Sequence, residues 1–342
     1  MPSRFSIICR ALLLLPVAIT SPALAATYTV TAIGPAGSDA YGINNLGNVV
    51  GSTPNGSATD PFMWTPGGGL HDLGTLGGNS VARAINDNNW VVGQSNDYAF
   101  RWTPAAGLTQ LGNFVAITDT NYGDARGINN SNTIIGCGDP GNYSYTQIWT
   151  SGANIPFVSS YSFGTAINDS GVYVGQLVDY PYPNNGYFQA PGYGSGLGTF
   201  LPDAINNSNV MVGIQGTVAT LDSLSPFSTT TIGKLNGSDS SSEAFAINSL
   251  SQVVGVSTGT GAFLWDSTHG IQNLSQMLAP GSSGWTILSG NGINNSGQIV
   301  GLGQLGGQQF AILLTPVPEP SAIGLASLGA AGLFLAARRR KS

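Results

Sequence analysis

The chain has little of the chemistry on which most enzymes and metal sites depend. Its 342 residues include two cysteines and two histidines, and only 8% of the residues are charged. The sequence contains no Gly-rich phosphate loop followed by Lys, no His-rich metal spacing and no Gly-x-Ser-x-Gly elbow. We therefore expect no cofactor, no resident metal and no catalytic residues.

Cysteine is too scarce for a disulfide framework. Cys9 lies in a segment that we expect to be removed, which leaves Cys137 as the single cysteine of the mature protein. A lone cysteine after Ile-Ile-Gly at the end of a predicted strand is most simply a small core residue. A nucleophilic Cys137 would need a nearby base, and His71 and His269 both lie next to predicted loops without a recognisable pattern.

Positive charge is also scarce between the two ends of the chain. Residues 26–316 contain four cationic side chains against fifteen acids, a net charge of −11. The four cations are Arg83, Arg101, Arg126 and Lys234. A surface of this sign repels a phosphate backbone, so we expect no nucleic acid among the partners.

The N-terminal segment has the features of a secretory signal peptide. A basic start precedes the short apolar run of residues 11–19, and small residues follow at 23–25. We expect cleavage between Ala25 and Ala26, which removes residues 1–25. The apolar run is too short to cross a bilayer.

The C-terminal segment has three parts in a characteristic order. Pro318, Glu319 and Pro320 are followed by seventeen uncharged residues, 321–337. As a helix, such a stretch is about 25 Å long and can cross a bilayer with local thinning. The end of the chain, 338–342, carries the basic cluster Arg338, Arg339, Arg340 and Lys341, which we expect to remain in the cytoplasm.

This order of parts resembles the PEP-CTERM sorting tail of Gram-negative surface proteins, which is also called an ice-binding-protein C-terminal domain. The resemblance implies transient anchoring, cleavage near Pro318–Pro320 by an exosortase-type processing enzyme, and release or attachment outside the cell. The ice-binding label implies no activity. A plain C-terminal membrane anchor is the alternative. In both cases residues 316–320 form an extended spacer, because their prolines lack backbone donors.

A nine-residue string, Ile-Asn followed by six variable residues and Gly, occurs seven times between the two ends. Successive copies are 38 to 46 residues apart, and their asparagines are Asn44, Asn86, Asn129, Asn168, Asn206, Asn248 and Asn294. A period of this length, built from short strands, is typical of a β-propeller. Each unit contains four predicted strands, one ending at Ile-Asn, one β-branched, one aromatic and one after a Gly-rich turn.

The strand count predicts how the ring closes. The seventh unit has its aromatic strand at 310–314 but no fourth strand, and an orphan strand at 28–33 precedes the first unit. Placing the orphan strand on the last blade removes the open edge. We therefore predict an all-β, seven-bladed propeller over residues 26–315. The aromatic strands of the fourth and fifth units, 186–189 and 217–220, are the least regular.

The repeats also resemble the HAF family of extracellular repeats, with residues 62–78 as the best copy. The resemblance covers residues 28–315 and is weak in the fourth and fifth units. It implies an exported repeat protein and brings no reaction with it.

The recurring asparagines and tryptophans each have two interpretations. The asparagines either line a central channel as a ligand ring or cap the turn after the first strand. The residue three positions later is always Gly, Asn or Ser, as a left-handed turn position requires, and this favours the caps. The recurring tryptophans, Trp64, Trp102, Trp149 and Trp265, fit packing between blades better than stacking on sugars.

One acidic segment has part of a calcium-loop pattern. Residues 119–124 place oxygens at alternate positions before and after a Gly, but they lack a third early oxygen and the distal Glu. An Asn/Asp-rich turn accounts for the segment as well. We therefore expect no metal there.

Together these features predict an exported, non-catalytic protein that is first anchored in the membrane and then located at the cell surface or in extracellular polymer. Its expected ligand is a surface polysaccharide or another surface protein, bound at one face of the propeller. The alternative is a propeller hydrolase or lyase acting on polysaccharide, which requires two carboxyl groups about 5 to 10 Å apart. The candidate acids are Asp72, Asp87, Asp97, Asp169 and Asp203.

Overall fold

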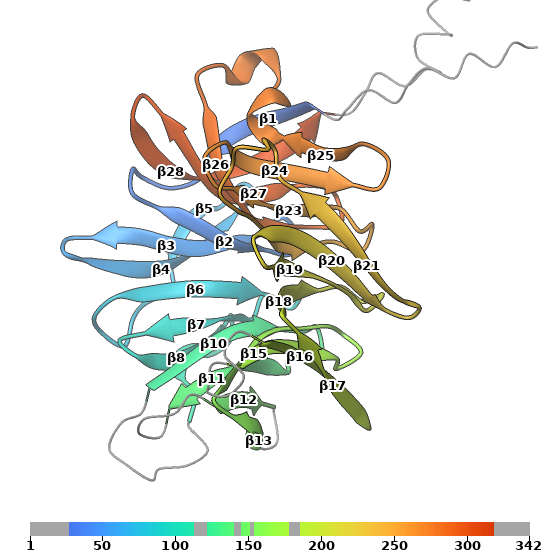
Figure 1. The fold of residues 1–342 in the computed structure, drawn as a ribbon. Coiled ribbons are helices and arrows are strands. Elements are labelled where there is room, and N and C mark those ends of the chain that lie inside the picture. The colour runs from blue at the N-terminus through green and yellow to red at the C-terminus, as the bar shows by residue number, and fades with distance from the viewer. Residues whose placement is uncertain (1–26, 113–121, 140–144, 151–153, 178–184, 318–342) are drawn as a thin grey trace, which may run out of the picture.

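The computed structural model of the protein describes residues 27–112, 122–139, 145–150, 154–177 and 185–317. These residues form seven four-stranded sheets, called blades 1 to 7 below (Figure 1). Blade 1 consists of β2 (Asp39–Ile43), β3 (Val49–Asn55), β4 (Ala58–Thr65) and β5 (Gly69–Asp72). Blade 2 consists of β6 (Ser80–Ile85), β7 (Val91–Ser95), β8 (Tyr98–Thr103) and β9 (Gly107–Gln110). Blade 3 consists of β10 (Tyr122–Ile128), β11 (Ile134–Asp139), β12 (Tyr145–Trp149) and β13 (Asn154–Ser160).

The remaining blades repeat this antiparallel order. Blade 4 consists of β14 (Ser162–Ile167), β15 (Tyr173–Leu177), β16 (Asn185–Ala190) and β17 (Tyr193–Gly198). Blade 5 consists of β18 (Phe200–Ile205), β19 (Val210–Gln215), β20 (Val218–Leu224) and β21 (Phe227–Gly233). Blade 6 consists of β22 (Ser242–Ile247), β23 (Val253–Ser257), β24 (Gly261–Asp266) and β25 (Gly270–Asn273). Two short 3₁₀ turns, η1 (Leu274–Gln276) and η2 (Pro280–Ser282), then lead to β26 (Thr286–Ile293), β27 (Ile299–Leu305) and β28 (Gln308–Val317) of blade 7.

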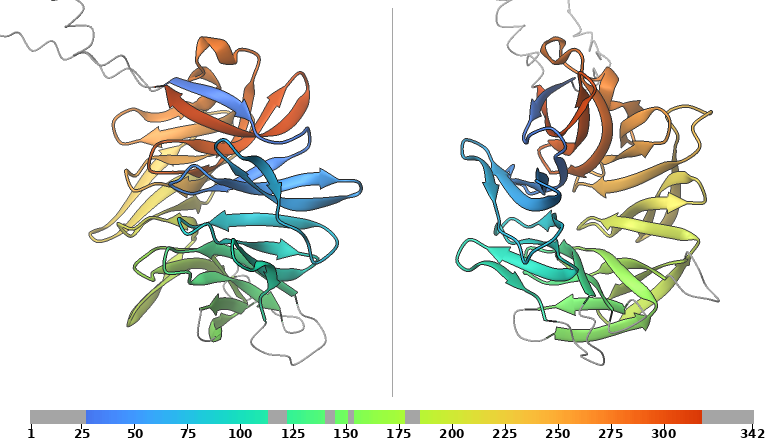
Figure 2. Two further views of the ribbon diagram at one scale, coloured as in Figure 1. Left: turned by 180° about the vertical axis from the view of Figure 1, so that it is seen from behind. Right: turned by 90° about the vertical axis from the view of Figure 1, so that its left-hand side faces the viewer.

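The first strand of each blade lies innermost, next to the propeller axis. Each of these seven innermost strands contacts the innermost strands of the blades before and after it, and β2 contacts β26, so the series closes into a circle. The views of Figure 2 show the blades following one another in chain order. The predicted seven-bladed propeller is confirmed.

The ring closes through the N-terminal strand, as the strand count predicts. β1 (Thr27–Ala32) is the fourth strand of blade 7 and pairs antiparallel with β28. The pairing runs from Thr27 opposite Val317 to Ala32 opposite Ile312. The irregular aromatic strands of the fourth and fifth units are also present, as β16 and β20.

The last strand ends three residues later than the predicted strand at 310–314. β28 continues through Pro316 to Val317, whereas the spacer was expected to begin at residue 316. The ladder between β27 and β28 ends at Leu314, so Pro316 pairs with β1 alone. A proline is tolerated there because it has a strand on one side only.

Both expected processing segments lie outside the described residues. One is the expected signal peptide with its Ala25–Ala26 cleavage position. The other is the C-terminal segment, with the motif Pro318–Pro320, the expected membrane helix 321–337 and the basic cluster. Within the part of the chain that the structure describes, no helix is both long and apolar enough to span a bilayer.

The hydrophobic core is divided into clusters that lie between neighbouring blades. Val49 and Phe62 of blade 1, for example, pack with Val300 and Leu313 of blade 7, and all four are buried. Buried area of this kind stabilises each blade only through its neighbours. The recurring tryptophans belong to these clusters, in agreement with the packing interpretation; they are Trp64, Trp102, Trp149 and Trp265.

Candidate functional site

Each Ile-Asn pair ends an innermost strand and begins a tight turn. The Oδ1 atom of Asn44 accepts hydrogen bonds from the backbone N–H groups of Leu46 at 3.1 Å and Asn48 at 2.9 Å. The same two bonds recur in the other six units. The third residue after each asparagine has a positive φ, including 80° at Gly47 and 58° at Ser251. The turn-cap interpretation is confirmed.

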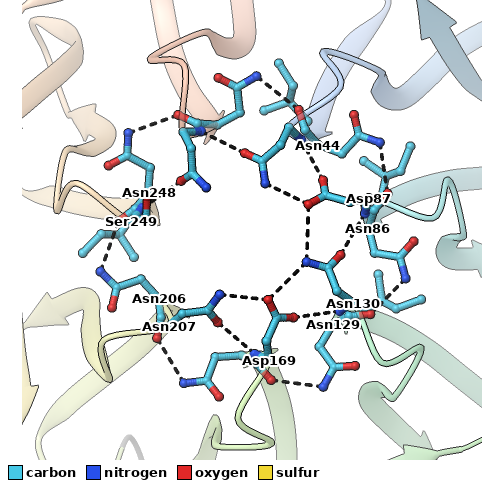
Figure 3. A pocket seen from close by; sticks show the side chains of 18 of the residues that line it. Asn44, Asn86, Asp87, Asn129, Asn130, Asp169, Asn206, Asn207, Asn248 and Ser249 are labelled. Atoms are coloured by element: carbon cyan, nitrogen blue, oxygen red, sulfur yellow. Dashed lines mark hydrogen bonds between the residues drawn. The ribbon is translucent and has the colours of Figure 1, made fainter.

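The same side chains also join the blades, which the sequence analysis did not predict. The Nδ2 atom of each asparagine donates to the backbone carbonyl of the equivalent asparagine in the next blade. The series starts from Asn44 to Asn86 at 3.0 Å and returns from Asn294 to Asn44 at 3.1 Å. We call this closed circle the asparagine belt (Figure 3). One amide therefore caps a turn with its oxygen and links two blades with its nitrogen.

The residues that follow the belt asparagines form a more exposed ring, which we call the mouth ring. Its members are Asn45, Asp87, Asn130, Asp169, Asn207, Ser249 and Asn295. Six members donate a backbone N–H to the side-chain oxygen of the next member. Among the described residues, the backbone N–H of Asn207 makes no such bond to the next member, Ser249, because the serine side chain is shorter. The belt, the mouth ring and the preceding isoleucines line a polar pocket of about 180 Å³ on the axis (Figure 3).

Two of the five candidate acids meet in the mouth ring. The Nδ2 atom of Asn130 lies 3.4 Å from Oδ2 of Asp87 and 3.1 Å from Oδ2 of Asp169, so the two carboxylates are near enough for a glycosidase pair. Both carboxylates, however, also accept the backbone N–H of the preceding ring member, at 2.9 Å from Asn45 and 2.8 Å from Asn130. A general acid must donate a proton, whereas these groups receive hydrogen bonds. Their contacts favour a structural role.

The other three candidate acids lie apart from this pair. Asp72 is exposed at the end of β5 and accepts the backbone N–H of Gly74 at 2.8 Å. Asp97 is exposed in the hairpin between β7 and β8, with φ of 69°. Asp203 lies on the innermost strand β18. The structure therefore brings together only Asp87 and Asp169 of the five.

The innermost strands carry a further ring, which the sequence analysis missed. In every blade the residue two positions before the isoleucine is the extra residue of a β-bulge. These residues, called the bulge ring below, are Tyr41, Arg83, Arg126, Thr165, Asp203, Phe245 and Asn291. Bulges re-aim side chains and are frequent beside functional sites. The belt is chemically uniform, whereas the bulge ring differs from blade to blade, so the bulge ring is the better candidate for specificity.

The bulge also explains the last residue of the repeated string. A Cβ atom at Gly51 would lie 2.0 Å from the carbonyl oxygen of Asp39 on the neighbouring strand. The equivalent glycines of the other six units would place a Cβ 1.9 to 2.3 Å from the equivalent oxygen. Only glycine permits this approach. The seven glycines were visible in the sequence, but their physical reason was not.

Four of the seven bulge residues contact the residue four positions before the isoleucine of the following blade. Arg83 Nε donates to Asp124 Oδ1 at 2.6 Å. The guanidinium of Arg126 lies 4.4 Å from the centre of the Phe163 ring and donates from Nε to Asp124 Oδ2 at 2.9 Å. Asp124, which is 1% exposed, thus binds two arginines.

This ion pair accounts for the described part of the partial calcium loop. Residues 119–121 lie outside the described residues, and the carboxylate of Asp124 is occupied by the two arginines. Across the part of the chain that the structure describes, no three His, Cys, Asp or Glu side chains are grouped to hold a metal. Cys137, paired with Asp124 across the sheet, is buried, and burial raises the pKa of its thiol to about 11. Its environment fits a core residue.

Two further pairs join a bulge residue to the equivalent position of the next blade. Asn291 Nδ2 donates to Asp39 Oδ1 at 3.2 Å, and burial raises the pKa of Asp39 to about 6. The bulge residue Asp203 is hydrogen-bonded to Glu243 of blade 6, and this is the only pair of like charge among these contacts of the described residues. Burial and the Glu243 carboxyl raise the pKa of Asp203 well above its ordinary value.

The Asp203–Glu243 contact requires a proton. Oδ2 of Asp203 is buried without a hydrogen-bond donor when both carboxyl groups are ionised, while Oδ1 accepts weakly from Gln176 Nε2 at 3.4 Å. A proton on one carboxyl group provides the missing donor. Carboxyl groups in direct contact are nearer than the roughly 5 to 10 Å of a glycosidase pair.

We predict that Asp203→Asn stabilises the protein at neutral pH. The raised pKa means that the folded state holds the proton more tightly than the unfolded state. The stabilisation is therefore complete below the ordinary pKa of Asp and is lost as pH rises through the raised value. An amide keeps a donor at every pH, so the variant should gain about 1–3 kcal/mol over the wild type above that range.

Urea unfolding between pH 4 and pH 8 measures the difference in the free energy of unfolding between Asp203→Asn and the wild type. Glu243→Gln should behave like Asp203→Asn, and Asp97→Asn, at an exposed hairpin, serves as the control. A difference between Asp203→Asn and wild type that does not grow with pH would contradict the shared proton.

Comparisons with known proteins support the tail and the fold. Residues 316–341 match the model of the PEP-CTERM protein-sorting motif. No curated protein matches the chain. Solved structures with similar folds include the following two. One is a catalytically inactive virginiamycin B lyase from Staphylococcus aureus with quinupristin, at 11% identity over 85% of this chain and 100% of that chain, with a TM-score of 0.53.

The second structure is a chain of the Mitotic Checkpoint Complex, at 11% identity over 93% of this chain and 100% of that chain, with a TM-score of 0.55. At this identity both comparisons show the propeller fold alone. Their different roles illustrate that the fold does not specify a function.

Proposed function

We propose that this exported propeller acts at the cell surface or in extracellular polymer as a non-catalytic protein that binds surface polysaccharide. The observation that carries the proposal is the sorting motif at residues 316–341, directly after a closed propeller. The motif accounts for export and a surface location, and processing of such tails is the task of an exosortase. Binding is the function that an exported domain with a polar axial pocket supports best.

The last strand shows on which side of the propeller the tail begins. In blade 7, Ile293 at the mouth of the pocket pairs with Ile299, and Ile299 pairs with Leu314. β28 continues beyond that level to Val317 and pairs there with Thr27. The tail therefore leaves from the side of the propeller that carries the mouth ring.

The spacer Pro318–Pro320 spans at most about 10 Å when fully extended. An anchored tail would thus hold the mouth ring close to the bilayer. Processing of the tail would free that face for a ligand.

The alternative function is a hydrolase or lyase that acts on polysaccharide. One observation favours it: burial and the Glu243 carboxyl raise the pKa of Asp203, and a carboxyl group with a raised pKa can act as a general acid. The direct contact of the two groups is nevertheless closer than the spacing of a glycosidase pair. The contacts of Asp87 and Asp169 favour binding instead, as described above.

One experiment separates these functions. The full chain, purified in mild detergent, is mixed with insoluble surface polymer from the producing cells and sedimented. We expect the protein to sediment with the polymer and to generate no new reducing or unsaturated ends on prolonged incubation. New ends would favour the enzyme, and protein that stays in the supernatant with every surface fraction would contradict binding.

We predict that Glu319→Ala blocks processing of the tail but leaves the protein in the membrane fraction. The reason is that the motif Pro318–Pro320 is the recognition element, whereas residues 321–341 would supply the anchor. Cell fractionation and mass spectrometry of the C-terminus measure the result, with neutral replacement of the four basic residues 338–341 as the variant that should weaken retention. A Glu319→Ala protein trimmed to the wild-type mass would favour a plain anchor.

A further inference from the structure

The few cations of the propeller are unevenly placed. Arg101 lies on β8 over the ring of Trp90, 4.9 Å from its centre. Lys234 donates to the backbone carbonyls of Asp239 at 3.1 Å and Ser240 at 3.0 Å. Arg101 and Lys234 therefore contact nearby residues that lie away from the propeller axis. The other two, Arg83 and Arg126, are bulge residues on neighbouring innermost strands.

Arg83 and Arg126 share a single counter-ion. Both use Nε to bind the carboxylate of Asp124, at 2.6 and 2.9 Å, so two positive charges face one negative charge. Asp124 is 1% exposed, whereas the arginine side chains are 34% and 31% exposed. Because the innermost strands surround the axis, we infer that this exposed surface faces the axis.

The terminal nitrogens of the two guanidinium groups remain available. No acceptor among the described residues bonds them, while Nε holds each group by one edge and the Phe163 ring supports Arg126. A guanidinium fixed in this way presents parallel N–H donors in the planar arrangement that a carboxylate accepts. The two arginines therefore form a prepared site for an anion.

The rest of the bulge ring favours a sugar acid over other anions. Elsewhere around the ring, Asp39, Asn291 and the Asp203–Glu243 pair offer acceptors that suit hydroxyl groups. Phe245 adds an aromatic side chain of the kind that packs on sugar C–H groups. Nearby carboxyl groups repel a doubly charged phosphate more than a singly charged carboxylate.

We propose that Arg83 and Arg126 bind the carboxylate of a uronic acid residue of a surface polysaccharide, with the other bulge residues contacting its hydroxyl groups. This inference rests on the proposed polysaccharide-binding function and assigns the ligand class and the residues that select it. It places recognition at the bulge ring, deeper along the axis than the asparagine belt.

The experiment compares an acidic and a neutral oligosaccharide. Titration calorimetry on the full chain in mild detergent uses tetragalacturonate and a neutral galactose tetramer, with a galactose phosphate as a further anion. We expect tetragalacturonate to bind at least about tenfold more tightly than the other two probes, as charge-assisted hydrogen bonds imply. Arg83→Gln and Arg126→Gln should each remove most of this preference.

Matched variants separate binding from folding. Arg101→Gln removes the same charge from β8, the third strand of blade 2, and should leave the preference unchanged. Loss of one arginine leaves Asp124 paired with the other, and a thermal melt checks folding. If a glutamine variant does not fold, Arg83→Lys and Arg126→Lys keep the charge beside Asp124 but lose the planar fork, and should still reduce the preference.

The outcomes are distinguishable. Equal affinity for the acidic and neutral tetramers, tighter binding of the phosphate, or an equal loss in Arg101→Gln would overturn the uronate site. Binding of the surface polymer in the sedimentation experiment would then still support the proposed function. Absence of binding to both tetramers and to the surface polymer would remove the proposed function together with the site.

Discussion

Deletion of residues 26–33 should abolish the cooperative folding of the propeller. β1 pairs with β28 along its whole length, and the backbone N–H and C=O of Tyr28 bond Met277 and Ala279 beside η1. Tyr28 is 1% exposed and Ile33 is 4% exposed, so the deletion also removes two core side chains. The loss should exceed about 5 kcal/mol, comparable to the whole stability of a typical domain.

Thermal unfolding followed by circular dichroism, together with size-exclusion chromatography, measures this effect. The control moves the strand instead of removing it. Because Thr27 lies opposite Val317, a two-residue Asn-Gly turn can join Val317 to Thr27 in a variant without the sorting tail. This relocated strand should restore folding. A deletion variant that melts like the wild type would mean that six complete blades suffice.

Replacing a belt asparagine with aspartate should destabilise the protein at neutral pH by about 3–5 kcal/mol. In Asn44→Asp the Oδ1 atom can still cap the turn, but the second carboxylate oxygen replaces the Nδ2 donor. That oxygen would face the backbone carbonyl of Asn86 and Oδ1 of Asn89, which now accept at 3.0 and 2.9 Å. The site is buried, since Asn44 is 4% exposed.

Protonation should reverse part of this loss, because a neutral carboxyl group can donate to the Asn86 carbonyl. Urea unfolding at pH 4 and pH 7 therefore tests the linking role separately from the capping role. Asn273→Asp is the matched control, because Asn273 caps η1 through Oδ1, which accepts from Ser275 at 2.9 Å, without a blade-to-blade donor. It should change stability by less than about 0.5 kcal/mol. Equal losses at Asn44 and Asn273 would show that capping alone explains the belt.

The belt shows why a correct local prediction was still incomplete. The turn-cap role of Asn44 depends on backbone groups within four residues of it, and the order of residue types along the chain predicts such contacts. The donor role depends on Asn86, forty-two residues away, in the next blade. A pattern that repeats once per blade can specify a contact between blades, but its geometry is known only when the blades are packed.

The bulge ring could be predicted less well. Arg83 is forty-one residues from Asp124 in the sequence, and Asp124, two residues before Arg126, was considered only as part of a loop. Their meeting depends on a one-residue bulge that shifts the register within each blade and on the rotation from one blade to the next. Alignment of the seven strings would have shown a variable position two residues before each isoleucine, but not which way its side chain points.

The sequence by itself determined the number of blades, the strand that closes the ring and the turns that end the innermost strands. Each of these depends on spacing, on strand count or on hydrogen bonds between near neighbours in the chain. Only the tertiary structure decided which polar residues meet at the axis: the closed belt, the two arginines on Asp124 and the Asp203–Glu243 pair. Apart from the contact between Arg126 and Asp124 on β10, these contacts join residues from different blades, so they exist only once the seven sheets are packed around a common axis.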